Sequence, residues 1–163
     1  MNFWFLNRNG RSFLIKEKDL HHELPCQRGV MCRTLIVEDN STFRRMLKEI
    51  LCARFPTMEI SEEPDGSELF SKLDTFHPNI VLMDIRLPGE NGLELTKMIK
   101  MNYPDIIVVI LTSYDLPEYR QAALQSKADH FVMKDSPTQN FIALVESLCT
   151  GLKHDGNNLI GLS

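Results

Sequence analysis

Short apolar runs alternate with helical spacings along most of the chain. Three runs of aliphatic and β-branched side chains, at residues 33–37, 80–83 and 106–111, are typical of parallel strands buried on both faces of a sheet. Weaker runs at residues 58–61 and 130–133 predict two more strands. Between these runs apolar side chains recur every three or four positions, which predicts helices.

A helix is expected after each of the five predicted strands. Ser41 offers an N-cap for the first, a turn at Gly66 precedes the second, and a loop at residues 88–92 precedes the third. The last two helices are predicted at residues 117–125 and 138–149. This alternation predicts an α/β fold with a parallel sheet and helices on both faces, because parallel strands need right-handed crossovers. Such sheets bind ligands beyond the carboxyl ends of their strands, so a functional site is expected there.

The two ends of the chain lack this alternation. Residues 1–31 show no sustained periodicity and are predicted to form a poorly ordered N-terminal extension. Residues 32–150 are expected to form one folded domain, and residues 151–163 are expected to form a flexible C-terminal tail.

Composition places the chain among ordinary globular proteins. Hydrophobic residues make up 43% and charged residues 25%, which leaves enough apolar material for a core. A net charge of −4 argues against direct nucleic-acid binding. No apolar run approaches the length, about 20 residues, that a membrane span needs. The four cysteines are scattered without the spacing of a metal site, so we expect reduced thiols and a cytoplasmic protein.

Charged and hydroxyl side chains stand at successive strand ends. In chain order they are Glu38 and Asp39, Asp84, Thr112 and Lys134. Carboxylates that converge on one edge of a sheet repel one another unless a cation lies among them, and Mg²⁺ suits such an oxygen-rich site. A carboxylate can also attack a phosphoryl group, whose oxygens a lysine and a threonine can contact. A single acidic residue at a strand end is usually a helix cap or a solvated loop residue, so the inference rests on the joint pattern.

Four segments carry these residues in ordered motifs. They are residues 35–40 (LIVEDN), 81–92 (VLMDIRLPGENG), 110–113 (ILTS) and 131–134 (FVMK). The intervals from Asp39 through Asp84 to the threonine and then the lysine are 45, 28 and 22 residues. In motifs and spacing, about residues 33–150 resemble the receiver domain of two-component response regulators. The predicted fold is accordingly flavodoxin-like, a doubly wound sheet of five parallel strands in the order 2-1-3-4-5 with helices on both faces.

The resemblance implies a role for each matched residue. Asp84 would accept a phosphoryl group from the phosphohistidine of a sensor histidine kinase or of a phosphotransfer protein. Glu38, Asp39 and Asp84 would hold Mg²⁺ together with the backbone carbonyl of Arg86. Lys134 would pair with Asp84 before phosphorylation and with the phosphoryl group afterwards.

The resemblance also implies a switch. Thr112 would move toward the phosphoryl oxygen, and Phe131 stands where the family places an aromatic side chain that follows the threonine. The alternative, that Phe131 is only a core residue of the fifth strand, stays open. Phosphorylation would shift a conformational equilibrium that is read at the fourth helix, fifth strand and fifth helix by a downstream protein or a second copy of the chain. The candidate residues of that surface are Tyr119, His130, Phe131 and Phe141.

Two features depart from the family pattern. Asp135 follows the lysine where the family often has proline, so no cis-proline is expected there. Residues 134–136 (KDS) resemble receivers attached to helix-turn-helix output domains, but only 13 residues follow Thr150. We therefore expect a stand-alone receiver that acts through partners, or a shortened relative or fragment of a transcription regulator.

Three rival functions compete with the receiver. A phosphatase or phosphotransferase that uses an aspartyl-phosphate would need a second aspartate two residues after Asp84, where Arg86 stands, so a turnover enzyme is not expected. A flavodoxin-like nucleotide binder would need a glycine-rich turn after the first strand. A receiver that binds partners without being phosphorylated stays open.

Overall fold

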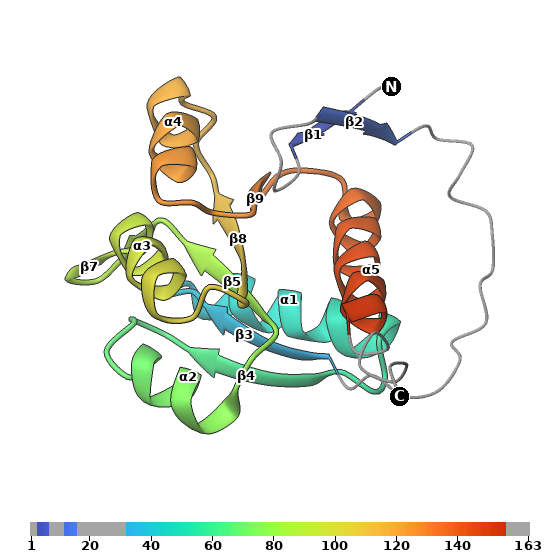
Figure 1. Ribbon diagram of the computed structural model, residues 1–163, viewed down its shortest axis with the longest axis horizontal. Coiled ribbons are helices and arrows are strands. Elements are labelled where there is room, and N and C mark those ends of the chain that lie inside the picture. Colours follow the sequence, from blue (N-terminus) through green and yellow to red (C-terminus); the bar gives the residue numbers. More distant parts are fainter. Residues whose placement is uncertain (1–2, 7–11, 16–31, 156–163) are drawn as a thin grey trace, which may run out of the picture.

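The computed structural model in Figure 1 describes residues 3–6, 12–15 and 32–155. Within these residues, five parallel strands form the main sheet. They are β3 (Arg33–Val37), β4 (Glu59–Glu63), β5 (Ile80–Asp84), β8 (Ile107–Thr112) and β9 (His130–Met133). They lie in the order β4-β3-β5-β8-β9, which is the predicted order 2-1-3-4-5 and confirms the predicted fold class.

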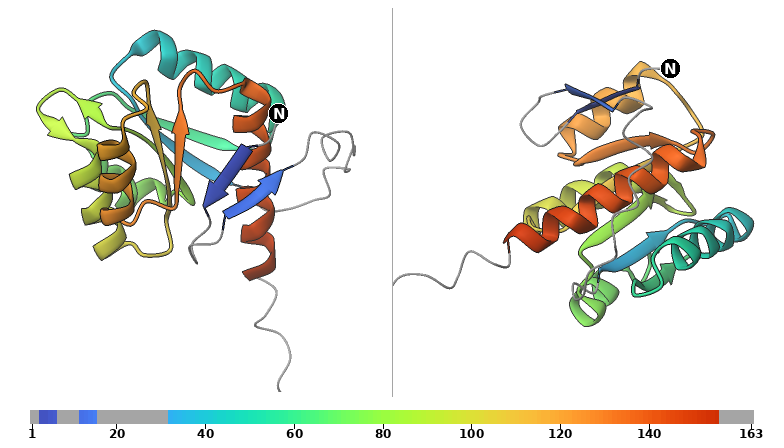
Figure 2. Two further views of the ribbon diagram at one scale, coloured as in Figure 1. Left: turned by 90° about the horizontal axis from the view of Figure 1, so that it is seen from above. Right: turned by 90° about the vertical axis from the view of Figure 1, so that its right-hand side faces the viewer.

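Helices cover both faces of the sheet, as Figures 1 and 2 show. On one face lie α1 (Ser41–Arg54) and α5 (Thr138–Asp155). On the other face lie α2 (Leu69–Phe76), α3 (Gly92–Asn102) and α4 (Pro117–Gln125). Among the described helices, none is long and apolar enough to cross a membrane.

The strand side chains alternate between two apolar cores. Leu35 and Val37 of β3 pack with α2, α3 and α4, whereas Ile36 between them packs with α1 and α5. Strands β5 and β8 alternate in the same way, with Val81 and Leu82 on opposite faces. Period-two alternation of large aliphatic side chains buries both faces of the sheet, and this burial is the main force that stabilises the domain.

Strand register brings the functional residues to one edge. Val37 pairs with Glu63 on one side and with Met83 on the other. The next residues along β3 and β5, Glu38 and Asp84, therefore emerge together at the carboxyl edge of the sheet. The backbone N–H of Glu38 continues the ladder by donating to the carbonyl of Glu63 over 3.0 Å.

Asn40, and not the predicted Ser41, caps the first helix. Its side-chain oxygen accepts hydrogen bonds from the backbone N–H groups of Thr42 and Phe43, at 3.1 and 3.0 Å. The capping amide satisfies two N–H groups that would otherwise lack partners, so the helix begins one residue after it. Asn91 caps α3 by accepting from the N–H of Leu93.

Three further differences from the predicted boundaries are larger than one residue. Helix α5 continues to Asp155, beyond the predicted end at residue 149, because Leu148 and Leu152 continue its apolar face against the core. The predicted loop at residues 88–92 includes strand β7 (Glu90–Asn91), which pairs with β6 (Arg86–Leu87). Strand β4 runs to Glu63, two residues past the predicted end.

Most of the predicted N-terminal extension lies outside the described residues. Its described parts, β1 (Phe3–Leu6) and β2 (Ser12–Ile15), pair as antiparallel strands. Residues 156–163 of the predicted C-terminal tail also lie outside the described part of the chain. Within that part no peptide bond is cis, and the bond from Lys134 to Asp135 is trans.

Gly92 lies against the backbone of the strand that ends in Asp84. Its N–H donates to the carbonyl of Ile85 over 3.0 Å. A Cβ atom at position 92 would lie 1.8 Å from the carbonyl oxygen of Asp84 and 3.1 Å from the Cα of Ile85. Only a residue without a side chain allows α3 to begin this close to β5.

Gly92→Ala should therefore lower the free energy of unfolding by about 2–4 kcal/mol, because backbone must move to admit the methyl group. Gly151→Ala is the matched control, since a Cβ there meets nothing within 4 Å and the residue lies in helix α5. That change should stabilise by about 0.5–1 kcal/mol through helix propensity. Urea denaturation measures both, and equal effects of the two substitutions would contradict the close approach.

Candidate functional site

Three carboxylates meet at the carboxyl edge of the sheet. Glu38 and Asp39 follow β3, and Asp84 ends β5. One ligand oxygen from each lies within 4.8 Å of the others. Glu38 is fully buried and Asp84 is 6% exposed, whereas Asp39 is open to solvent. The fold thus gathers three acidic groups predicted from sequence into one cluster, the acidic pocket, in which two groups are buried and one is open to solvent.

Lys134 is the counter-ion of this pocket. It follows β9 and approaches Oε2 of Glu38 at 2.7 Å and Oδ2 of Asp84 at 3.1 Å. Its backbone N–H donates to the carbonyl of Thr112 over 2.8 Å, which ties the end of β9 to the end of β8. The predicted pairing of Lys134 with Asp84 is present, and the additional contact with Glu38 was not predicted.

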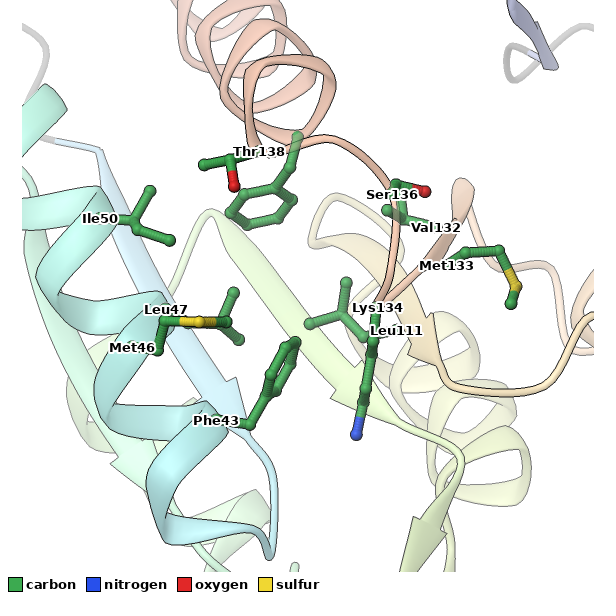
Figure 3. A pocket seen from close by; sticks show the side chains of 11 residues that line it. Phe43, Met46, Leu47, Ile50, Leu111, Val132, Met133, Lys134, Ser136 and Thr138 are labelled. Carbon is green, nitrogen blue, oxygen red and sulfur yellow. The ribbon is translucent and has the colours of Figure 1, made fainter.

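An apolar wall supports the lysine. Its Nζ lies 4.9 Å from the centre of the Phe43 ring, within the range of a cation–π contact. Next to Phe43 and Lys134, a cavity of about 30 Å³ lies between α1 and the start of α5, with room for about one water molecule. Figure 3 shows the cavity, with the Lys134 amine beside Phe43. Apolar surroundings of this kind fix the lysine stem while its charged end faces the carboxylates.

Electrostatics in the pocket favour a cation. Burial raises the pKa of Glu38, and the nearby charge of Asp84 raises it further, whereas the contact with Lys134 acts in the opposite direction. Oε2 of Glu38 is buried and lies 2.7 Å from the amine of Lys134. One lysine faces the carboxylates of both Glu38 and Asp84, so negative charge remains in excess, and a metal ion would balance it.

The donor set fits Mg²⁺. Hard divalent cations prefer oxygen ligands, and Mg²⁺ usually takes one or two carboxylates and keeps several waters. Glu38, Asp39 and Asp84 offer such oxygens, and Asp39 is open to solvent. The backbone carbonyl of Arg86, at the start of β6, remains a predicted ligand.

Thr112 lies buried at the end of β8, next to the strand that carries Asp84. Its hydroxyl oxygen accepts a hydrogen bond from the backbone N–H of Tyr114 over 3.1 Å. A hydroxyl that accepts in this way can still donate its own proton. The Thr112 hydroxyl therefore keeps a proton that it can donate, and it is hydrogen-bonded to the loop that carries Tyr114.

The side chain of Arg86 contacts two tyrosines, one in the loop after β8 and one in α4. It donates to the hydroxyl of Tyr114 at 3.3 Å and of Tyr119 at 3.1 Å, and its guanidinium lies 4.2 Å from the Tyr114 ring centre. The hydrogen bond to Tyr119 raises the already high pKa of the arginine, which stays charged. Tyr119 is thus tied to the loop after β5.

The predicted output residues differ in exposure. Phe131 is half-buried against the α2–α3–α4 core, and the guanidinium of Arg120 lies 5.0 Å from its ring centre. His130 is half-buried too, and burial lowers its pKa. Phe141 lies on the buried face of α5 and is only 6% exposed. It is therefore removed from the candidate surface.

Arg44 was missed from sequence. From the first turns of α1 it donates to the backbone carbonyl of Glu38 at 2.5 Å, and its Nε contacts Glu62 at 3.3 Å. It therefore holds the backbone that presents the acidic pair. Its position four residues after the helix cap could have indicated that the Arg44 side chain lies near the strand end. Its contact with Glu62 could not be predicted, because β4 is distant in sequence.

A buried acid on β4 was also missed. Glu63 is 1% exposed, accepts from the backbone N–H of Gly66 at 3.1 Å and pairs with Lys72 at 2.7 Å. Its carbonyl holds Glu38 in the ladder. Glu63 therefore fixes the turn into α2 beside the pocket and contributes no metal ligand to the cluster.

Comparison with known proteins identifies one family. Residues 34–146 match the response regulator receiver domain. The chain is 31% identical over 121 residues to the transcriptional regulatory protein LnrK of Bacillus subtilis, and 29% identical over 120 residues to the oxygen regulatory protein NreC of Staphylococcus carnosus. These alignments cover 74% and 73% of the chain and 55% of each relative, so the chain spans about half the length of the curated relatives it matches.

Solved structures share the fold. A CheY-like response regulator receiver domain protein from Methanospirillum hungatei superposes with a TM-score of 0.70 at 24% identity, over 77% of this chain and 99% of that one. A LuxR-family DNA-binding response regulator from Staphylococcus aureus gives 0.67 at 23% identity, over 73% and 99%. At these identities the likeness concerns the fold alone.

Arg44→Met should lower the free energy of unfolding by about 1–3 kcal/mol, because a charge-assisted hydrogen bond to the Glu38 carbonyl is lost in a partly buried setting. Arg45→Met is the matched control. The Arg45 side chain is mostly exposed, and its ion pair with Glu49 is long, at 3.9 Å. The control should change stability by less than about 0.5 kcal/mol. Urea denaturation of both variants measures the two effects. A loss of stability in Arg45→Met as large as that in Arg44→Met would contradict the role of Arg44 in holding the Glu38 backbone.

Proposed function

The chain belongs to the response regulator receiver domain family, and from this premise we propose that it is a phosphorylation-operated signalling switch whose phosphoacceptor is Asp84. The observation that carries the proposal is the position of the Asp84 carboxylate, between two further carboxylates and the amine of Lys134. A carboxylate in such a pocket can serve as a nucleophile toward phosphorus once the surrounding negative charge is balanced.

The proposed transfer takes the phosphoryl group from a phosphohistidine. An oxygen of Asp84 attacks the phosphorus, the new O–P bond forms, the P–N bond breaks, and the departing imidazole keeps the electron pair. Glu38, Asp39 and Asp84 would hold Mg²⁺, with the Arg86 carbonyl as a further ligand. The metal ion supplies positive charge that balances the phosphoryl oxygens.

Lys134 and Thr112 would recognise the product. The amine of Lys134, now 3.1 Å from Asp84, would pair with a phosphoryl oxygen. The hydroxyl of Thr112 would donate to another oxygen and draw the Tyr114 loop inward. We propose that Phe131 responds to this movement, and that the surface of α4, β9 and the exposed side of α5 carries the signal.

The partners follow from this role. A sensor histidine kinase or a phosphotransfer protein would supply the phosphoryl group, and a downstream protein or a second copy of the chain would read the signal. LnrK is named a transcriptional regulatory protein. This receiver carries a net charge of −4, and we propose that it makes no direct contact with nucleic acid. We place it in the cytoplasm, as a signalling domain and not as a turnover enzyme.

Asp84→Asn should abolish phosphoryl uptake from acetyl phosphate and Mg²⁺, because an amide cannot act as the nucleophile. Intact-mass measurement should show one added phosphoryl group on the unaltered chain and none on the variant. Asp105→Asn, at an exposed position before β8, is the matched control and should be labelled normally.

Two results would overturn this assignment. Normal labelling of Asp84→Asn would place the phosphoryl group elsewhere. An unaltered chain that binds Mg²⁺ but takes up no phosphoryl group, from acetyl phosphate or a histidine kinase, would support the rival receiver that acts without phosphorylation.

Lys134→Gln should separate metal binding from phosphoryl transfer. Removing the competing amine should raise Mg²⁺ affinity about threefold to tenfold, since the carboxylates lose their internal counter-ion. Phosphoryl uptake should nevertheless slow, because the amine no longer meets the phosphoryl oxygens. Calorimetric Mg²⁺ titration beside mass-resolved labelling tests this, with the exposed Lys97→Gln as control. Weaker Mg²⁺ binding by Lys134→Gln would instead mean that the lysine organises the metal site.

A further inference from the structure

Two cysteines distant in sequence meet at the end of the sheet opposite the acidic pocket. Cys32 directly precedes β3, and Cys149 lies in the second half of α5, 117 residues later. Their sulfur atoms are 2.9 Å apart. Figure 1 shows the start of β3 and the last turns of α5 close to one another.

The core fixes this approach. Cys32 is 4% exposed and belongs to the apolar cluster that joins α1 and α5 to the sheet, and Cys149 packs against the same cluster. Leu148, next to Cys149, is partly buried and packs against it too. A disulfide bond has an S–S length of about 2.0 Å, so covalent linkage needs the sulfurs to approach by only about 1 Å more.

The two thiols differ in a way that suits stepwise oxidation. Cys149 is partly exposed whereas Cys32 is buried, so Cys149 is the more accessible of the two residues to a small oxidant. Cys149 also donates a hydrogen bond to the sulfur of Cys32, which lowers the pKa of the Cys32 thiol although burial opposes the effect. A thiolate is the nucleophile in disulfide formation.

We propose that Cys32 and Cys149 form a redox-active dithiol site, which a hydroperoxide converts into a disulfide that fastens α5 to the start of β3. In the first step Cys149 gives up its thiol proton, and the resulting thiolate attacks one oxygen of hydrogen peroxide. An S–O bond forms, the O–O bond breaks, and the departing oxygen leaves with the electron pair as hydroxide. Cys149 becomes a sulfenic acid.

The second step closes the bond. The thiolate of Cys32 attacks the sulfur of Cys149, the S–S bond forms, and a second hydroxide leaves from Cys149. The two protons of the original thiols convert both hydroxides to water. The two thiols have then lost two electrons, and one hydrogen peroxide has gained them.

The disulfide would act on a part of the domain that the acidic pocket does not occupy. Glu38 stands at the opposite end of β3 from Cys32, six residues further along the chain. Linking β3 to α5 closes a loop of more than 100 residues, which restricts the unfolded chain strongly. It also fixes α5, one element of the proposed signalling surface, onto the sheet. The dithiol site does not depend on Asp84 being phosphorylated.

The rival explanation is that both cysteines are small apolar side chains that fill the core. The test treats the whole chain with hydrogen peroxide and follows its intact mass, its disulfide-linked peptides and its Tm. We expect a loss of two hydrogen atoms, a linked pair of peptides containing Cys32 and Cys149, and a Tm higher by about 5–10 °C. Dithiothreitol should reverse all three changes.

Two variants sharpen the result. Cys149→Ser should remove the linked peptides and the rise in Tm, and its Tm in reductant shows whether the fold is kept. Cys52→Ser, on the exposed side of α1, should behave as the unaltered chain. Three outcomes would overturn the proposal: over-oxidation of Cys149 without a link, a link that involves Cys26 or Cys52 instead, or a Cys32–Cys149 link that leaves the Tm unchanged. None of these readouts involves phosphorylation, so the proposal can fail while the proposed function stands.

Discussion

Repulsion among Glu38, Asp39 and Asp84, gathered at one edge of the sheet, is the constraint around which this domain is arranged. Two of the three carboxylates are buried, and among the described cations Lys134 alone contacts them. Burial of acidic groups that are only partly balanced by positive charge costs stability, and proteins keep such groups mainly where they serve a function. The same imbalance makes the pocket suitable for a divalent cation and for a phosphoryl group held beside it.

The rest of the fold holds this edge in place. The aliphatic side chains that alternate along β3 and β5 set a register that brings Glu38 and Asp84 out together. Arg44 and Glu63 hold the Glu38 backbone from two sides. Gly92 lets α3 begin directly against Asp84. Stability that arises from apolar burial across the whole domain thus compensates for an unfavourable cluster at one end.

Much of the fold was predictable because it follows from local periodicity. The bounds of α4 and β9 agree with the sequence prediction, and the strand order and the receiver family are confirmed. The acidic cluster was predictable because parallel strands end at a common edge, so residues distant in sequence could be placed together. Its roles in metal binding and phosphoryl transfer remain proposals.

Features set by tertiary contact could not be read from the sequence. The cap at Asn40 depends on side-chain geometry, and the continuation of α5 depends on Leu152 meeting the core. Arg44 contacts Glu62 on β4, and Cys32 contacts Cys149, which lies 117 residues later in the chain. Phe141 was predicted on the signalling surface but faces the core. Helical spacing alone does not show which side of a helix the sheet covers.

The central claim is that Asp84 is the phosphoacceptor within a Mg²⁺ site built by its acidic neighbours. The most direct measurement is a crystal structure of the protein grown with Mg²⁺ and beryllium fluoride, which mimics a phosphoryl group. We expect a BeF₃ group bonded to an Asp84 carboxylate oxygen, Mg²⁺ held by Glu38, Asp39 and Asp84, and Lys134 turned from Glu38 toward a fluorine. Beryllium fluoride absent from Asp84, or a metal ion bound away from these carboxylates, would contradict it.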